Sequence, residues 1–419
     1  MTIRTSPIHH PALSGSSAAL VSVLVLTTSS GFLKQEHTFR VFDEDGVTVA
    51  ETSGGPKYDT ELFSFERLAR IHEDENRPES LMGNPSSDKS RMGEDGSVFV
   101  TDVKYNRILR FDAAGEYLNG IGGQGQGPGE YLGPRLLSTD DGTVTIWDPM
   151  LNRTSFYRYD GTFLESEQHF GRRSLAIYGL YRGTGGELVH LEYRTEFEGR
   201  RAYVYHSYFA TIYSTEHDTI ATLVAGPVKG HYQIGGWICW RLFTGFPSAT
   251  YHPDRGIIMT TGNEPVFKYY RLDGTLSRIV RLNIPAEPVT RRERRAWAVA
   301  ERHMLEQTPP EGLSMEQERL RHVEFNDPKG FWTDVTVDHN GFIWAAQPGD
   351  TFRGMTGTGM TYEHLVFSPE GEYLGITNLP GASAISRGHL ITRQDNEAGT
   401  GIELVVYRIV PAVPGLEFP

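Results

Sequence analysis

The sequence predicts an all-β fold assembled from a repeated strand–turn–strand unit, and two observations carry this prediction. Residues 95–118 align without a gap with residues 141–164, which lie 46 positions later, and eight of the 24 aligned positions are identical. Turn signals that contain glycine then recur through the rest of the 419-residue chain. A period of roughly 40 to 50 residues with strand-type content is typical of propeller blades. The fold class that we expect is therefore a β-propeller.

The turn signals predict the number of blades. Six tight corners, each followed by an apolar strand, contain a glycine that can adopt a positive φ. These corners are Asp95-Gly96, Asp141-Gly142, Gly185-Gly186, Arg255-Gly256, Asn340-Gly341 and Arg387-Gly388. A second corner follows in four of the units, at Gly115, Gly161, Gly274 and Gly371. We therefore expect six four-stranded blades.

The two ends of the chain are expected to close the ring together. The unit that starts at Gly388 lacks a final strand, and a hairpin over residues 38–51 has no blade of its own. Residues 61–71 have the composition of a further strand. Closing a ring with strands from both ends removes an open edge with unpaired backbone groups. We expect the N-terminal hairpin to complete the sixth blade.

Residues 1–30 have the pattern of a secretory signal peptide. Arg4 precedes an apolar stretch at residues 18–26, and small residues follow at 27–31. A charged start, a short apolar core and a small-residue exit are typical of export signals, and the apolar stretch is too short to span a bilayer. We expect a secreted or periplasmic protein without a transmembrane segment, with the propeller at residues 31–419. The alternative is a disordered N-terminal extension.

One insertion interrupts the β pattern. Residues 286–325 are rich in charge and in helix formers, and Trp297, Ala300, Met304 and Leu305 fall near helical spacing. Such spacing gives a helix one apolar face. We expect two short helices packed on the propeller surface.

The composition limits the partners. The formal net charge is −13, whereas binding to nucleic acid or to an anionic membrane needs a positive field. The chain has one cysteine, Cys239, so an intrachain disulfide is excluded. No nucleic-acid partner is expected.

A stretch of the first unit resembles a known repeat. Residues 98–102 read VFVTD, residues 106–112 read NRILRFD, and residues 121–134 read IGGQGQGPGEYLGP. Together with the GEYL corner between them, they resemble an NHL-type repeat. The chain is similar to the six-bladed β-propellers of this kind found in the bacterial envelope. The resemblance implies the fold and the compartment, and it implies no activity, because propellers include both binding proteins and enzymes.

An aspartate and an Asn-Arg pair recur at the same blade position. Asp102 precedes Asn106-Arg107, and Asp148 precedes Asn152-Arg153. These side chains could bind a ligand. Recurrence in successive blades favours a structural role instead, because an aspartate at a strand end can accept hydrogen bonds and hold a turn.

The glycine-rich run at residues 120–125 satisfies the pattern GxGxxG. A dinucleotide site needs a helix directly after this pattern. Here Pro128 and Pro134 follow, and the next element expected is a strand. We interpret the run as a loop between two blades.

Propellers usually work at the mouth of the central channel, where the innermost strands converge. Counting back seven or eight residues from the corner glycines predicts where these strands begin. The channel-mouth candidates for ligand binding combine charge with aromatic stacking surfaces. They are Lys89, Arg135, Tyr178, Asp334 and Trp332.

Metal catalysis has weaker support in the sequence. A lactonase-like calcium site needs several convergent oxygen ligands, and a zinc site of the amidating-lyase kind needs convergent histidines. The weak candidates are Asp88, Asp334 and His190. We expect no metal and no cofactor.

The favoured function is a binding or scaffolding module, not an enzyme, that recognises a protein or small-molecule ligand at the channel mouth. The alternative is a metal-dependent hydrolase or lyase, lactonase-like or amidating-lyase-like, that acts at the central channel. We expect a monomer.

Overall fold

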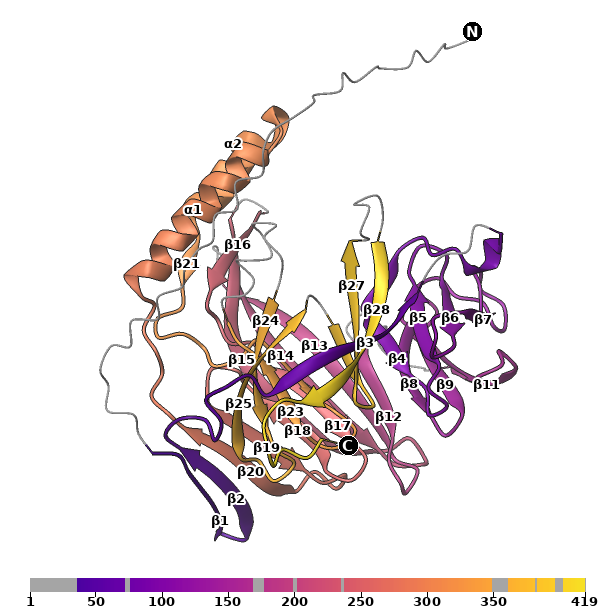
Figure 1. Cartoon of the computed structure of the whole chain (residues 1–419), viewed down its shortest axis with the longest axis horizontal. Helices are drawn as coiled ribbons and strands as arrows, with labels where there is room; N and C mark the ends of the chain where they lie inside the picture. The colour runs from indigo at the N-terminus through magenta and orange to yellow at the C-terminus, as the bar shows by residue number, and fades with distance from the viewer. Residues whose placement is uncertain are drawn as a thin grey trace. The chain divides into compact units, whose positions relative to one another are not determined.

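A computed structural model describes residues 36–71, 76–168, 177–198, 202–234, 237–348, 361–380, 383–395 and 402–418. The predicted signal peptide, residues 1–30, lies outside these ranges. The described residues form six sheets arranged as the blades of a propeller, which confirms the predicted fold class (Figure 1).

Each blade runs outward from an innermost strand. Blade 1 consists of β4 (Pro85–Met92), β5 (Val98–Asp102), β6 (Arg107–Phe111) and β7 (Tyr117–Ile121). Blade 2 consists of β8 (Arg135–Asp140), β9 (Thr143–Asp148), β10 (Arg153–Arg158) and β11 (Phe163–Gln168). Blade 5 consists of β22 (Asp334–Val337), β23 (Ile343–Ala346), β24 (Thr361–Phe367) and β25 (Tyr373–Pro380).

Two blades have six strands instead of the predicted four. Blade 3 consists of β12 (Ile177–Arg182), β13 (Leu188–Glu198), β14 (Ala202–Tyr213), β15 (Thr219–Ile234), β16 (Trp237–Leu242) and the short β21 (Glu324–Phe325). Blade 4 consists of β17 (Ser248–His252), β18 (Gly256–Thr260), β19 (Val266–Tyr270) and β20 (Leu276–Asn283), followed on its outer side by β2 (Val47–Ser53) and β1 (Thr38–Glu44).

Blade 6 closes the ring with strands from both ends of the chain. It consists of β26 (Ser383–Ser386), β27 (His389–Asp395), β28 (Ile402–Pro411) and β3 (Phe63–Ile71). The N-terminal strand β3 pairs antiparallel with β28 from Leu404↔Ile71 to Pro411↔Phe63. Ala69 and Ile71 are buried with Leu404 and Val406 in one apolar cluster.

The expectation that the N-terminal hairpin completes the sixth blade was wrong. The hairpin β1–β2 instead extends blade 4, where β2 pairs parallel with β20. Ala50 of β2 is buried against Val280 of β20 in the core. β1 is mostly exposed, which suits an outermost strand, whereas β3 supplies the buried apolar residues that a closing strand needs.

The segment between the hairpin and β3 crosses blade 5. The amides of Lys57 and Tyr58 donate to the carbonyl oxygens of Tyr373 (3.2 Å) and Leu374 (2.9 Å) of β25. The Lys57 ammonium also lies 2.8 Å from the Glu372 carboxylate. Residues 38–71 therefore contact three successive blades.

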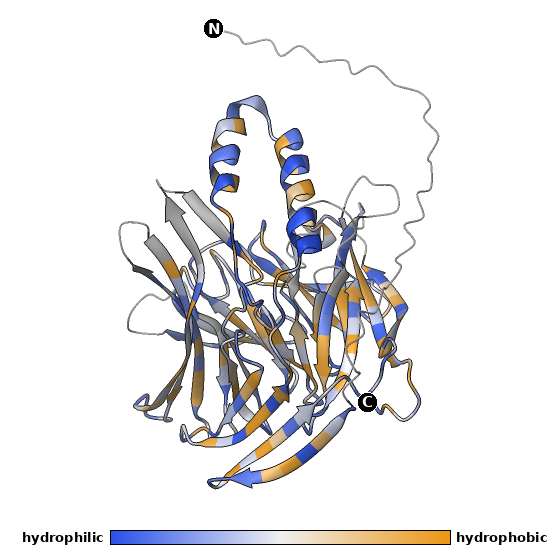
Figure 2. Ribbon diagram, turned by 90° about the vertical axis from the view of Figure 1, so that its left-hand side faces the viewer, coloured by the Kyte–Doolittle hydropathy of each residue, from blue (hydrophilic) through white to orange (hydrophobic). Residues whose placement is uncertain are grey.

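The helical insertion is confirmed. Helix α1 (Arg291–Gln307) and helix α2 (Pro310–Arg321) form a hairpin that stands out from the strands (Figure 2). A capping box between Thr290 and Glu293 begins α1, and it satisfies amides that have no partner within the helix. Trp297 and Ala300 are buried with Leu242 and Phe243, which fixes the hairpin to the end of blade 3.

The six predicted first corners are confirmed as the turns between each innermost strand and the next. Their glycines all have positive φ, between 67° at Gly142 and 90° at Gly186. Tight hairpin turns need this backbone conformation, which glycine adopts without steric cost.

The recurring aspartate and Asn-Arg pair fix the loop that enters each of the first two blades. Asp148 is fully buried. Its carboxylate accepts from the amides of Leu132 (2.6 Å) and Gly133 (3.2 Å) before β8, and from Met150 (2.8 Å) and Leu151 (3.0 Å) after β9. Arg153 donates to loop carbonyl oxygens, among them that of Gly127 at 2.9 Å. The structural interpretation of this motif agrees with these contacts. The glycine-rich run is a loop only from Gly122 onward, because Gly120 and Ile121 end β7.

Blade 1 repeats the arrangement. The buried Asp102 accepts from the amides of Gly83 and Asn84, both at 3.2 Å, and Arg107 donates to the carbonyl oxygen of Leu81. In both blades the aspartate accepts hydrogen bonds from amides of the entering loop, and the arginine donates hydrogen bonds to carbonyl groups of that loop. We call these two sets the Asp–Arg clamps.

We expect Asp148→Ala to lower the free energy of unfolding by about 3 kcal/mol, because four partly buried amides lose the carboxylate that accepts their hydrogen bonds. Urea denaturation followed by circular dichroism measures the loss. Asp160→Ala is the control, since that carboxylate is exposed at a corner of the same blade, and it should change stability little. Equal losses in the two variants would contradict the structural role of Asp148.

Candidate functional site

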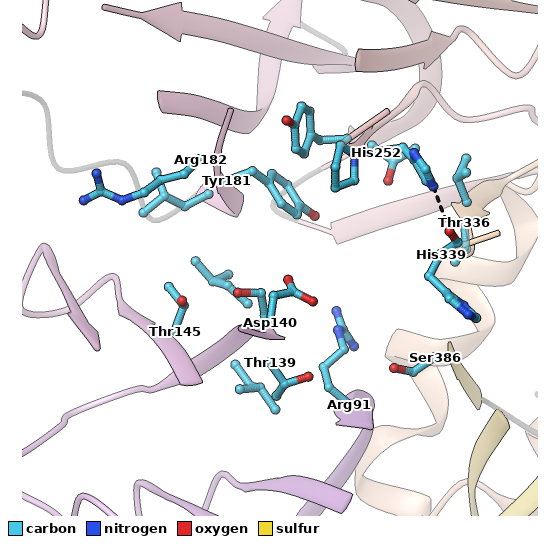
Figure 3. Close-up of a pocket in the computed structure, with 18 of the residues that line it drawn as sticks. Arg91, Thr139, Asp140, Thr145, Tyr181, Arg182, His252, Thr336, His339 and Ser386 are labelled. Atoms are coloured by element: carbon cyan, nitrogen blue, oxygen red, sulfur yellow. Dashed lines mark hydrogen bonds between the residues drawn. The ribbon is translucent and has the colours of Figure 1, made fainter. Parts of the chain in front are cut away.

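The innermost strands of all six blades surround a cavity of about 1010 Å³. Its lining includes residues of β4, β8, β12, β17, β22 and β26, so it takes in the central channel of the propeller. Phe156 on β10 and Leu164 on β11 also line it, so it extends from the channel along one face of blade 2. The close-up shows side chains from different blades pointing into this space (Figure 3). Pockets for small ligands in proteins typically measure roughly 300 to 1,000 Å³, and this cavity is at the upper end.

The cavity has two ends with different residues. One end lies where the innermost strands begin, and we call it the entry end. Arg135 and Asp334 are the first residues of β8 and β22 and line the cavity there. The other end lies at the six corner turns, and we call it the corner end. The charged side chains of the two ends are separated by the length of the strands.

Hydroxyl groups line the wall between the two ends. Ser138, Thr250 and Thr336 come from the innermost strands of blades 2, 4 and 5 and are half-buried at the cavity. A hydroxyl group both donates and accepts hydrogen bonds. The wall can therefore bind polar groups of either kind.

Tyr208 also lines the cavity, although it lies on β14, the third strand of blade 3. Its ring makes an edge-to-face contact with Tyr193 at 5.1 Å between centroids. Burial, and then the negative charge of Asp334, raise the pKa of the Tyr208 hydroxyl. Asp334 of blade 5 and Tyr208 of blade 3 therefore both line the cavity and interact electrostatically.

The corner end contains cations that are paired across blades. Arg387 of blade 6 lies 2.7 Å from Asp140 of blade 2 and 3.2 Å from Glu94 of blade 1. Arg182 pairs with Glu167. Arg91 and Asp140 both point into the space drawn in Figure 3.

His252 connects blades 4 and 5 at the corner end. Its Nδ1 accepts from the Asp254 amide (3.2 Å), and its Nε2 lies 3.1 Å from the carbonyl oxygen of His339 (Figure 3). An amide donor on Nδ1 places the ring proton on Nε2. Burial lowers the pKa of His252, which favours this neutral form. The imidazole of His339 is exposed.

Asp338 fixes the corner of blade 5. Its buried carboxylate accepts from the amides of Asn340 (2.9 Å) and Phe342 (3.0 Å) and from the indole nitrogen of Trp344 (3.0 Å). Burial raises the pKa of Asp338 to about 6, although these hydrogen bonds oppose the shift. The folded protein therefore holds this proton more tightly than the unfolded chain.

The raised pKa of Asp338 predicts a pH dependence of stability. Its contribution is fully present below the unfolded pKa of 3.8 and is lost as the pH rises through about 6. The free energy of unfolding should fall over this range by up to about 3 kcal/mol from this group. Urea denaturation at a series of pH values should show a smaller fall for Asp338→Asn. Asp254→Asn, at an exposed corner position of blade 4, is the control. If the free energy of unfolding of Asp338→Asn falls with pH as steeply as that of the original protein, Asp338 is not the group responsible.

The predicted site residues divide into three groups. Arg135 and Asp334 line the cavity. Lys89, Asp88 and Tyr178 lie on the innermost strands β4 and β12, next to register shifts, and their side chains lie outside the described part of the structure. In blade 6, seven or eight residues before Gly388 are positions 380 and 381, whereas the innermost strand β26 begins at Ser383.

Two predicted residues do not line the cavity. Trp332 is completely buried in the core, where its ring stacks on Phe267 at 4.4 Å and its indole nitrogen donates to Thr260 at 2.8 Å. Its candidacy as a binding residue was wrong, because no ligand in the channel can reach it. His190 lies on the second strand of blade 3, with its ring 4.8 Å from that of Tyr213, and is not among the residues that line the cavity.

Sequence reasoning missed Tyr208, Arg91 and the corner-end histidines. Tyr208 lies outside an innermost strand, so the count from the corners could not find it. Arg91 follows a register shift in β4 between Ser86 and Arg91. Histidine at a corner carries no sequence signal that separates a channel residue from a surface residue.

Within the described ranges, no three histidine, cysteine, aspartate or glutamate side chains lie together in a way that could hold a metal ion. The same part of the chain has no helix long and apolar enough to cross a membrane.

Comparisons with known proteins agree with the architecture. A family model described as a 6-bladed beta-propeller matches residues 91–220. No curated protein matches the chain.

Solved structures give weak similarities. A Bacteroides fragilis protein described as exported is 10% identical, with a TM-score of 0.49 over 86% of this chain and 99% of that one. A gluconolactonase from Xanthomonas campestris is 13% identical, with a TM-score of 0.37 over 85% and 97% of the two chains. Virginiamycin B lyase from Staphylococcus aureus is 12% identical, with a TM-score of 0.35 over 83% and 99%. Similarities this low carry no argument about activity, and the fold of this chain is that of a six-bladed β-propeller.

Proposed function

We propose that this protein is a binding module that takes a small polar ligand into the central channel of the propeller. The observation that carries the proposal is the cavity of about 1010 Å³, to which all six blades contribute. Side chains from six separate sheets can contact one ligand there, and a well-packed ring holds them in place.

The lining supports a polar ligand. Arg135, Asp334 and the Tyr208 hydroxyl are near the entry end, and Ser138, Thr250 and Thr336 follow along the wall. A few fixed polar groups in a concave site provide orientation and specificity. The sequence analysis also allowed a protein partner. In this second form of the proposal, the partner protein would bind at the entry end.

A substitution that fills the channel tests the proposal. We expect a thermal-shift screen of small polar compounds to give ligands whose affinity falls at least about tenfold in Thr336→Trp, because the indole occupies the middle of the cavity. Isothermal titration calorimetry measures the affinity.

Thr222→Trp is the matched control, because Thr222 is exposed on β15 and is not among the residues that line the cavity. Both variants should show the circular dichroism spectrum of the original protein. Ligands that bind Thr336→Trp and the original protein equally would place binding elsewhere and refute the proposal.

We infer that the protein is exported. The charged start, the apolar stretch at residues 18–26 and the small residues after it support this inference. When the full chain is produced in a bacterium, fractionation should recover it outside the cytoplasm, with its N-terminus cleaved near residue 30. Replacing Leu24 and Leu26 by lysine should retain the chain uncleaved in the cytoplasm, and export of that variant would contradict the inference.

A further inference from the structure

We propose that the ligand of the channel is a short peptide with a free amino terminus and a free carboxyl terminus. This inference rests on the proposed function, since it names the class of ligand that the same cavity takes. It is carried by the placement of Arg135 and Asp334 on opposite walls.

The two residues occupy equivalent positions in their blades. Arg135 pairs with Trp147, and Asp334 pairs with Ala346. Trp147 and Ala346 each lie five residues after the corner glycine of their blade, Gly142 and Gly341. Arg135 and Asp334 therefore lie at the same level of the channel.

The two residues also belong to opposite blades. Arg135 belongs to blade 2 and Asp334 to blade 5, and in a ring of six blades these are directly opposite. A guanidinium group and a carboxylate group thus line the entry end on opposite sides. A ligand that reaches both walls gains from carrying a negative group at one end and a positive group at the other.

The environment of each group favours such a ligand. Arg135 is half-buried, and a guanidinium group can form two parallel hydrogen bonds with a carboxylate. The Asp334 side chain is exposed to the cavity. Tyr208 lines the same cavity, and an aromatic ring together with a carboxylate suits an ammonium group.

Other charged groups of the lining are placed differently. Asp140 and Arg182 are the last residues of β8 and β12, Arg387 lies at the corner of blade 6, and Glu165 and Glu167 lie on β11, the outermost strand of blade 2. Arg91, Asp141 and Asp254 belong to the corner end, with Arg91 at the end of β4 and the two aspartates at corner turns. Of the described lining residues on innermost strands, Arg135 and Asp334 are the charged pair at the entry end.

The wall between the two groups fits a peptide backbone. Peptide amides need hydrogen-bond acceptors and carbonyl groups need donors, and the hydroxyls of Ser138, Thr250 and Thr336 supply both. A single α-amino acid holds its amino nitrogen and carboxyl carbon only about 2.5 Å apart, and each further residue adds up to about 3.5 Å. Groups on opposite walls therefore favour a peptide of two or more residues over a free amino acid.

Titration calorimetry with four peptides tests the inference. The probes are trialanine, N-acetyl-trialanine, trialanine amide and the peptide blocked at both ends. We expect trialanine to bind and each single block to weaken binding at least about tenfold, because each removes a charge-assisted contact. A series from alanine to tetra-alanine should show that free alanine binds most weakly.

Two variants that each remove one charge assign the ends of the peptide. Asp334→Asn should weaken the binding of trialanine. N-acetylation of the peptide should then cause no further loss of affinity in this variant. Arg135→Gln should do the same for amidation of the carboxyl end. Melting curves of both variants establish that they are folded. Asp273→Asn with Arg271→Gln, at an exposed corner of blade 4 outside the cavity, should leave the affinities unchanged.

The outcomes separate this inference from the proposed function. If the four peptides bind equally, or none binds while other compounds from the screen respond to Thr336→Trp, the peptide inference is overturned and the binding module stands. If no compound responds to Thr336→Trp, both are overturned. If acetylation and Asp334→Asn weaken binding independently, the amino terminus lies elsewhere and the assignment of Asp334 is wrong.

Discussion

The pairing of β3 with β28 is the contact on which the rest of the structure depends. A propeller blade buries its faces only against its two neighbours, so an open ring would leave apolar faces and strand edges in water. In this chain the closing sheet takes one strand from residues 63–71 and three from the C-terminal part. The cavity exists because the ring is closed, since its lining requires all six innermost strands.

The Asp–Arg clamps connect the fold to the candidate site. Asp148 holds the amides of Leu132 and Gly133, and β8 begins two residues later with Arg135. The buried carboxylate therefore fixes the backbone from which the Arg135 side chain extends. The clamp of Asp148 repeats that of blade 1 and contacts only the protein itself, yet it positions Arg135, which is specific to blade 2.

Much of the fold could be predicted from the sequence, because the corner glycines mark the start of each blade and their spacing is regular. The same regularity placed Arg135 and Asp334 at the start of innermost strands. It also reached Lys89 and Tyr178, which lie on innermost strands beside register shifts, and their part in the site stays a prediction. The same count failed for Trp332, because an aromatic residue in a blade core and one at a channel mouth have the same sequence pattern. The hairpin at β1–β2 was assigned to the wrong blade, because alternating strand residues do not specify which sheet edge they will meet.

The path of residues 38–71 has a consequence for the order of folding. This segment is synthesised first, yet its partners are β20, β25 and β28, of which β28 ends at Pro411. Pairs such as Ser64 with Val410 are separated by most of the chain, and contacts of such high sequence separation form late because the intervening chain must first be brought together. During synthesis the blades can form one after another, and β2 can meet β20 once blade 4 has been made, while β3 stays unpaired until β28 has been synthesised. Export in an unfolded state would suit such a chain, because the ring can then close in one step with both ends present.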